Sequence, residues 1–113
     1  EGEDMISSDI IRGHLDAIIL RLIYEKDRYG YEISKEIASR TEGRFQIKEA
    51  TLYAVFQRLE KRGYIRSYEG DVSRGGRRRY YAITPKGKTE LTESVREWSK
   101  VKEIIDIFME GTL

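Results

Sequence analysis

Arginine and glycine residues cluster in the second half of the chain. Four guanidinium groups fall within six residues, in the segment Arg74-Gly75-Gly76-Arg77-Arg78-Arg79. Glycine lets a backbone approach a ligand closely, and arginine binds phosphate oxygens and favours the electronegative minor groove of DNA. The cluster therefore predicts contact with a nucleic-acid backbone. The alternative is that these arginines only keep an exposed strand edge soluble.

A second set of candidate contacts lies on a helix that we expect over about Glu49 to Arg62. Its apolar stripe is formed by Leu52, Val55, Phe56 and Leu59, and Gly63 ends it. The opposite face carries Ala50, Ala54, Gln57 and Lys61, with Thr51, Tyr53 and Arg58 at its edges. Small residues let a helix enter the major groove, Gln57 suits a bidentate pair with adenine, and the hydroxyl and cationic groups suit phosphates. Every surface helix has a polar face, so the arginine cluster is the stronger signal.

The charge of the chain is concentrated in the same region. The net charge is only +1, but residues 44–88 hold twelve basic and four acidic side chains and so carry +8. Residues 1–43 carry −4 and residues 89–113 carry −3. A basic block in a nearly neutral protein is the electrostatic pattern expected of a protein that binds a polyanion.

The sequence contains no candidate residues for a catalytic or metal site. The 113 residues include no cysteine and a single histidine, His14, which rules out thiolate nucleophiles, disulfides and cysteine-based zinc sites. No serine–histidine–acid set and no phosphate-binding glycine loop is present. We expect no cofactor and no enzymatic activity. No apolar run reaches the roughly 18 residues of a membrane span and no signal peptide is visible, so we expect a cytoplasmic protein.

The elements that position these residues follow from apolar periodicity and from capping signals. Behind Ser7-Ser8-Asp9 we expect one helix of about 17 residues, and a second over about Tyr31 to Arg40. The segment Asp27-Arg28-Tyr29-Gly30 predicts a turn, and Phe45 and Ile47 predict a very short strand. After the helix over 49–62, the segments 64–69 and 77–84 predict a hairpin whose turn is 71–76. Thr84 and Pro85 are typical of the start of a final helix of about 25 residues.

This order of elements predicts a mainly α protein with a small β-hairpin, in the α+β class. Residues 8–84 read as a winged helix-turn-helix domain and residues 85–110 as a C-terminal dimerisation helix. The final helix is about 37 Å long, more than the preceding domain is expected to cover. Its apolar side chains are Leu91, Val95, Trp98, Val101, Ile104, Ile105 and Phe108. Since the second half would otherwise be left in water, we expect these residues to form the interface of a homodimer.

Trp98 lies midway along this final helix. Two interpretations remain open for it. It is either ordinary packing in the dimer interface or an aromatic wall of a slot between the subunits, where a flat molecule stacks.

Taken together, these residues resemble the PadR family of bacterial transcriptional regulators. The matching segments are Tyr29-Gly30-Tyr31-Glu32-Ile33, Ala50-Thr51-Leu52-Tyr53, Arg58-Leu59-Glu60-Lys61-Arg62-Gly63-Tyr64-Ile65, Gly75-Gly76-Arg77-Arg78-Arg79-Tyr80-Tyr81 and Ile83-Thr84-Pro85-Lys86-Gly87. The short form, with one C-terminal helix and the segment Glu97-Trp98-Ser99-Lys100-Val101, resembles the multidrug-sensing branch. The resemblance implies a dimeric repressor of a palindromic site, touched by Tyr53 and by wing residues near Gly75 to Arg78.

The same resemblance implies that Trp98 stacks on aromatic compounds between subunits. We expect the ligand site to comprise Trp98, Leu15, Ile18, Val101 and Lys102. Two residues depart from the family pattern. Lys48 replaces a capping side chain before the helix over 49–62 and adds positive charge near DNA. Lys102 stands where that branch has an acid, which argues against cationic ligands.

The sequence thus predicts a sequence-specific DNA-binding transcriptional regulator. We expect a cytoplasmic, homodimeric repressor that binds palindromic double-stranded DNA and is released by a small planar aromatic effector. The alternative is a winged-helix module that binds protein and not DNA. The arginine cluster argues against this alternative, and only DNA binding is expected to weaken steeply with salt.

Overall fold

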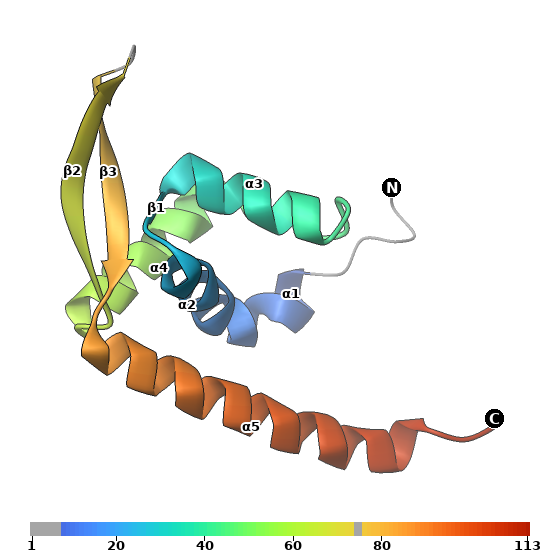
Figure 1. Cartoon of the computed structure of the whole chain (residues 1–113). Coiled ribbons are helices and arrows are strands. Elements are labelled where there is room, and N and C mark those ends of the chain that lie inside the picture. The colour runs from blue at the N-terminus through green and yellow to red at the C-terminus, as the bar shows by residue number, and fades with distance from the viewer. Residues whose placement is uncertain (1–7, 74–75) are drawn as a thin grey trace.

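The computed structural model describes residues 8–73 and 76–113, and it shows a helical body, a projecting hairpin and a long final helix (Figure 1). In chain order the elements are α1 (Ser8–Ile11), the 3-10 turn η1 (Arg12–His14), α2 (Leu15–Glu25), β1 (Arg28–Tyr29), α3 (Gly30–Arg40), α4 (Glu49–Lys61), β2 (Ile65–Ser73), β3 (Gly76–Ile83) and α5 (Pro85–Met109). Helices α2, α3 and α4 pack together beside a wing made of β2 and β3. The predicted fold class, a winged helix-turn-helix followed by a long helix, is confirmed.

The hydrophobic core lies where α2, α3 and α4 meet. The most deeply buried side chains are those of Phe56, Ile19, Leu20, Ile23, Ile33, Leu59 and Val55. Phe56 of α4 also stacks on Tyr81 of β3, with ring centroids 4.0 Å apart, which joins the helix to the sheet. The predicted apolar stripe of α4 is buried, so its opposite face is turned to solvent.

The sheet contains a strand that the sequence did not reveal. This strand is β1. The strand order of the sheet is β1-β3-β2, all antiparallel, and β1 pairs with β3 through Arg28↔Tyr81 and Tyr29↔Tyr80. The turn predicted at residues 27–30 is therefore wrong for Arg28 and Tyr29, which form β1. A strand of two residues is too short to show the alternation of apolar and polar side chains that predicts a strand. The predicted strand at residues 45–47 is also wrong: Phe45 is buried but belongs to a loop. β2 extends four residues past the predicted end at Glu69.

The first predicted helix is interrupted. The chain forms α1, then η1, then α2, and does not run as one helix of 17 residues. Gly13 lies in the middle of the 3-10 turn, and glycine costs about 1 kcal/mol relative to alanine inside an α-helix. The break turns α1 away from the axis of α2 (Figure 1).

The final helix begins as the sequence predicts and then leaves the body of the molecule. The Thr84 hydroxyl accepts a hydrogen bond from the amide of Gly87 at 3.0 Å, and Pro85 occupies the first turn. A Cβ atom at Gly87 would lie 2.1 Å from the carbonyl oxygen of Tyr64, so the start of α5 presses against the segment that follows α4. Leu91 is buried, but beyond it α5 extends away from the wing and past the helical body (Figure 1).

Candidate nucleic-acid interface

The outward face of α4 presents the residues predicted to contact DNA. Ala50, Thr51, Tyr53, Ala54, Gln57, Arg58 and Lys61 are all exposed. Lys48 is the N-cap residue and makes no side-chain capping bond, as its chemistry predicts. The first turns of α4 therefore offer small side chains, hydroxyl groups and a lysine to a ligand approaching from solvent.

Tyr53 is held against the start of α3. Its ring meets the Phe56 ring edge to face, with centroids 5.3 Å apart, and the side chain remains 43% exposed. A Cβ atom at Gly30 would lie 2.6 Å from the Tyr53 Oη atom. Glycine at position 30 is therefore what allows the tyrosine hydroxyl to lie at the junction of α3 and α4.

Arg58 is engaged differently from the phosphate contact predicted for it. Its Nε and Nη2 atoms donate to the two carboxylate oxygens of Asp16 on α2, at 3.0 and 2.6 Å. These hydrogen bonds raise the pKa of the Arg58 guanidinium above its ordinary value. Arg62 lies 3.5 Å from the same carboxylate. In this structure Arg58 ties α4 to α2. This contact could not be predicted from the sequence because the partners are 42 residues apart.

The wing arginines in the described part of the chain have three different partners. Arg77 pairs with Glu69 across the hairpin at 3.3 Å, and Arg79 lies 4.0 Å from Glu60 of α4. The guanidinium carbon of Arg78 lies 4.5 Å from the centre of the Tyr29 ring. Gly76 has φ of +105°, a conformation that favours glycine. The predicted contacts Arg74 and Gly75 lie outside the described residues.

A row of tyrosines runs beside these arginines, and the sequence did not single it out. Tyr29 of β1 meets Tyr80 of β3 edge to face at 5.4 Å, and Tyr80 stacks on Tyr68 of β2 at 5.8 Å. The Tyr68 hydroxyl donates to Asp27 at 2.5 Å, and this bond raises the Tyr68 pKa. We call Tyr29, Tyr80 and Tyr68 the tyrosine row. The predicted hairpin was the available signal, because its two strands pair Tyr68 with Tyr80 in the structure.

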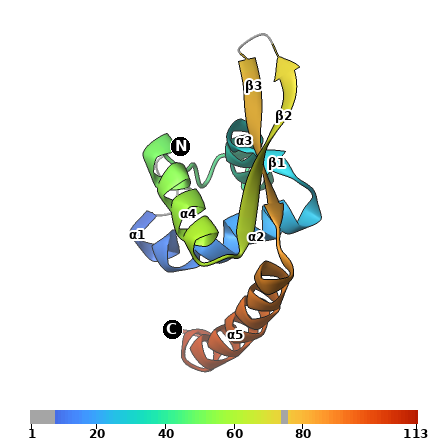
Figure 2. The same ribbon diagram turned by 90° about the vertical axis from the view of Figure 1, so that its left-hand side faces the viewer.

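The two groups of predicted contacts lie at one end of the molecule. Figure 2 shows the beginning of α4 and the tip of the wing on the side opposite α5. Lys48 is the N-cap of α4, Thr51 and Tyr53 belong to its first turns, and Arg77 and Arg78 begin β3. Lys61 belongs to the last turn of α4, and Figure 2 shows that this end of the helix lies nearer the base of the wing.

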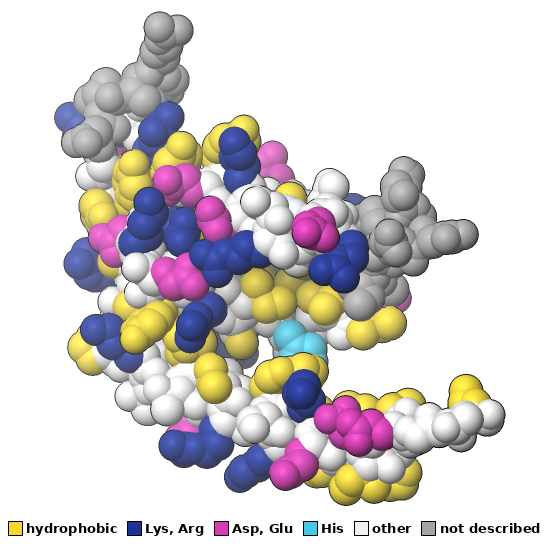
Figure 3. All heavy atoms as spheres, turned by 45° about the vertical axis from the view of Figure 1, so that its right-hand side comes forward, with side chains coloured by type: hydrophobic (Ala, Val, Ile, Leu, Met, Phe, Trp, Pro, Cys, Tyr) yellow, Lys and Arg dark blue, Asp and Glu magenta, His cyan; other side chains and the backbone are white. Residues whose placement is uncertain are grey.

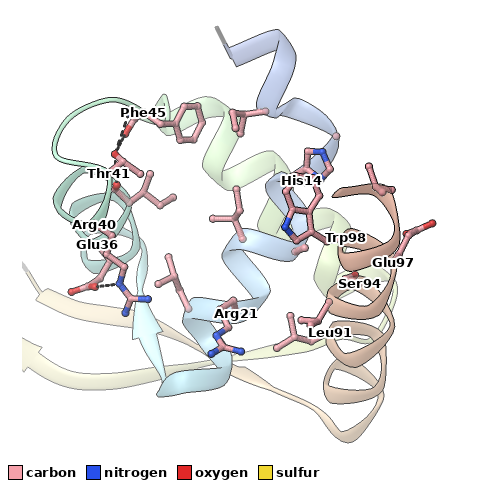
Figure 4. Close-up of a pocket in the computed structure, with 18 residues that line it drawn as sticks. His14, Arg21, Glu36, Arg40, Thr41, Phe45, Leu91, Ser94, Glu97 and Trp98 are labelled. Carbon is pink, nitrogen blue, oxygen red and sulfur yellow. Dashed lines mark hydrogen bonds and ion pairs between the residues drawn. The ribbon is translucent and has the colours of Figure 1, made fainter. Parts of the chain in front are cut away.

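A separate cavity of about 650 Å³ opens between α5 and the helical body. Figure 3 shows apolar side chains on both sides of this hollow, with the histidine at its edge. Trp98 of α5 is 49% exposed and meets the His14 ring edge to face at 5.2 Å, and both rings line the cavity (Figure 4). The sequence analysis gave His14 no contact partner, and this ring contact across 84 residues was missed.

The residues predicted to bind a ligand are only partly brought together. Trp98, Ile18 and Val101 line the cavity. Leu15 is buried in the core and does not line it. Lys102 is exposed on α5 and does not line it either.

Charged side chains form the wall of the cavity opposite Trp98. Arg40 lines it together with Glu36, to which its Nε atom donates at 2.8 Å (Figure 4). Arg40 also donates to both carboxylate oxygens of Glu25, one of them at 3.0 Å. The hydrogen bond from Arg40 lowers the pKa of Glu25 to about 2. This network joins α2 to α3 at the far side of the cavity.

Some kinds of site are missing from the described part of the chain. Residues 8–73 and 76–113 contain no group of three or more side chains able to hold a metal ion. None of the helices in those ranges is long and apolar enough to cross a membrane.

Comparison with known proteins agrees with the geometry. The model of the transcriptional regulator PadR-like family matches residues 19–93. The chain is 72% identical over 107 residues to an uncharacterized protein from Lysinibacillus sphaericus, with 95% of this chain and 98% of that protein covered. A solved transcriptional regulator from Clostridium thermocellum is 50% identical with a TM-score of 0.86, over 94% of this chain and all of that one. A PadR family transcription regulator from Clostridium difficile is 38% identical with a TM-score of 0.77, over 86% of this chain and 99% of that one. The chain therefore belongs to the PadR-like family of transcriptional regulators, which are DNA-binding proteins and not enzymes.

Proposed function

We propose that this regulator is a homodimeric repressor whose α4 enters the major groove while its wing contacts the minor groove. The observation that carries the proposal is the common location of the exposed α4 face and the wing arginines at one end of the molecule. Gln57 then reads a base edge, and Thr51, Tyr53 and Lys61 bind phosphates. We place this activity in the cytoplasm, with the operator DNA.

The second half of α5 supports dimerisation. Ile104 is 58% exposed, Ile105 46% and Phe108 78%, and Val95 and Trp98 are about half exposed. A second copy packed on this surface removes these side chains from water. Leu91 lies in the core of its own chain and is not available for that contact. In this proposal residues 8–84 form the DNA-binding domain and 85–110 the dimerisation helix.

A two-fold axis between the subunits gives the two α4 helices a fixed separation. DNA half-sites one helical turn apart are centred about 34–36 Å from each other, so a palindromic operator matches such a dimer. The spacing depends on how the paired α5 helices cross. A change in that crossing angle therefore alters operator affinity without touching either recognition helix.

The cavity beside Trp98 supports a small planar aromatic effector. Its volume of about 650 Å³ lies within the range of small-molecule sites, and most of its lining is apolar. A flat molecule stacked on Trp98 at the subunit interface changes the crossing of the α5 helices and releases the operator. Binding must be reciprocal, so operator DNA weakens the effector by the same factor.

Selection from a pool of random duplexes tests the repressor proposal, with sedimentation equilibrium at micromolar concentration as its companion. We expect enrichment of an inverted repeat and a mass of two chains. Enrichment of a single asymmetric half-site by a folded monomer contradicts the dimeric repressor. Enrichment of no sequence contradicts specific recognition altogether.

A further inference from the structure

We propose that Tyr29 is a positioning residue for DNA binding, because its ring holds the guanidinium of Arg78 toward the DNA backbone. The proposal deepens the DNA-binding function above and rests on it. The guanidinium carbon of Arg78 lies 4.5 Å from the centre of the Tyr29 ring. A cation within about 6 Å of an aromatic face is attracted by the ring quadrupole.

Tyr29 is well fixed before any ligand arrives. Its backbone pairs with Tyr80 in the sheet, and its amide donates to the carboxylate of Glu32 in the first turn of α3 at 3.3 Å. Its ring meets the Tyr80 ring edge to face, with an interplanar angle of 67°. The ring is therefore a rigid platform where β1 meets the start of α3.

The rest of the tyrosine row fixes Tyr80 in turn. Tyr80 stacks on Tyr68 with an interplanar angle of 16°, and the Tyr68 hydroxyl donates a hydrogen bond to the Asp27 carboxylate. A Cβ atom at Gly70 would lie 2.3 Å from the Tyr80 ring, so glycine is required for the ring to lie across β2. The row thus connects the platform under Arg78 to both strands of the wing.

Arg78 differs from its two described neighbours in the wing. Side chains alternate along a strand, so Arg78 shares a face of β3 with Tyr80, while Arg77 and Arg79 lie on the other face. Arg77 pairs with Glu69 and Arg79 approaches Glu60, and both carboxylates partly neutralise their arginines. The Tyr29 ring restricts the orientation of the Arg78 guanidinium but carries no negative charge that would neutralise it. Since a free arginine side chain loses rotamer entropy when it becomes ordered, this placement prepares Arg78 for a phosphate.

Duplex binding measured by fluorescence anisotropy tests the proposal in a double-mutant cycle of Tyr29→Leu and Arg78→Ala. We expect Tyr29→Leu to weaken binding about three- to fivefold in the parent protein. The same substitution has no further effect in the Arg78→Ala background. Tyr29→Phe keeps the ring and binds like the parent protein. An equal loss in both backgrounds, or no loss in the parent, overturns the proposal.

A second measurement uses the unsubstituted protein and does not depend on whether Tyr29→Leu folds. The ring current of Tyr29 shifts the Arg78 side-chain proton resonances upfield in the free protein, and added duplex perturbs them again. Arg78 resonances at random-coil positions, or resonances unchanged by bound duplex, overturn the proposal alone. Failure of the unsubstituted protein to bind any duplex overturns the DNA-binding function, and the positioning role with it.

Discussion

Asp16 and Arg58 form a bidentate pair, with Arg58 Nη2 donating to Asp16 Oδ1 at 2.6 Å and Nε donating to Oδ2 at 3.0 Å. The pair joins α2 to α4, the proposed recognition helix. The residues that follow Asp16 on α2, Ala17, Ile18 and Arg21, line the cavity beside Trp98. A single helix, α2, thus lines the proposed effector site and also contacts the proposed DNA-reading helix α4.

Replacing Asp16 with asparagine removes a negative charge that competes with DNA for Arg58 and Arg62. We expect Asp16→Asn to bind random duplex roughly two- to fivefold more tightly at low salt. Its free energy of unfolding falls by less than about 1 kcal/mol, because the pair is partly exposed. Anisotropy titration and urea unfolding measure both. Glu93→Gln, which removes the partner of Arg96 on α5, is the matched control and leaves affinity unchanged. Weaker duplex binding by Asp16→Asn would contradict this expectation and would show that the Asp16–Arg58 pair orients α4 for DNA.

The carboxylate of Glu25 makes stability depend on pH. Arg40 lowers its folded-state pKa from 4.5 to about 2, so the ionised form is favoured in the folded state. The resulting stabilisation is fully present above pH 4.5 and is lost as the pH falls toward 2. After allowance for solvent screening it amounts to about 1 kcal/mol. Urea midpoints from neutral pH to about pH 3 should fall more steeply for the parent protein than for Glu25→Gln. Parallel curves would contradict this assignment.

Two glycines in helical segments should respond oppositely to alanine. A Cβ atom at Gly87 meets the Tyr64 carbonyl oxygen at 2.1 Å, and backbone cannot move away cheaply. We expect Gly87→Ala to cost about 2–3 kcal/mol of stability and to loosen α5. At Gly13 no atom lies within 4 Å of the added Cβ, so Gly13→Ala is neutral or stabilises by up to about 1 kcal/mol. Thermal unfolding of both variants checks the contrast, and equal losses would refute the contact at Tyr64.

Trp98 is the single tryptophan of the chain, so indole fluorescence reports on the proposed effector site. We expect planar polycyclic aromatics to quench it saturably and to lower operator affinity. Calorimetry with Trp98→Ala should show that uptake is lost while sedimentation still gives a dimer. If no compound quenches the indole, or if quenching leaves operator affinity unchanged, Trp98 is ordinary packing.

The sequence predicted those features that depend on neighbouring residues. The apolar stripe of α4, the cap at Thr84 and the stop at Gly63, which has φ of +80°, are all local and all confirmed. The wing was predicted from two strand patterns separated by a glycine-rich segment, and β2 and β3 do pair as a hairpin. The break at Gly13 was missed because the apolar periodicity continues across it.

The features that sequence reasoning missed are contacts between distant segments. The strand β1 exists only because Tyr29 pairs with Tyr80, and two residues alone have no strand pattern. The ion pair between Arg58 and Asp16 was missed because Asp16 lies on another helix, 42 residues away. A polar residue on a helix face has a predictable direction but not a predictable partner.

The central claim is that the wing binds the DNA backbone, and the salt dependence of duplex binding tests it most directly. Arg77 and Arg96 are matched, since each is largely exposed and pairs with a glutamate, at 3.3 and 3.2 Å, but only Arg77 lies on the wing. We expect the logarithm of the association constant of the parent protein to fall linearly with the logarithm of salt concentration. Arg77→Ala should reduce that slope by about one, and Arg96→Ala should leave it unchanged. Equal slopes for the parent protein and Arg77→Ala, or a duplex affinity independent of salt, would contradict the claim.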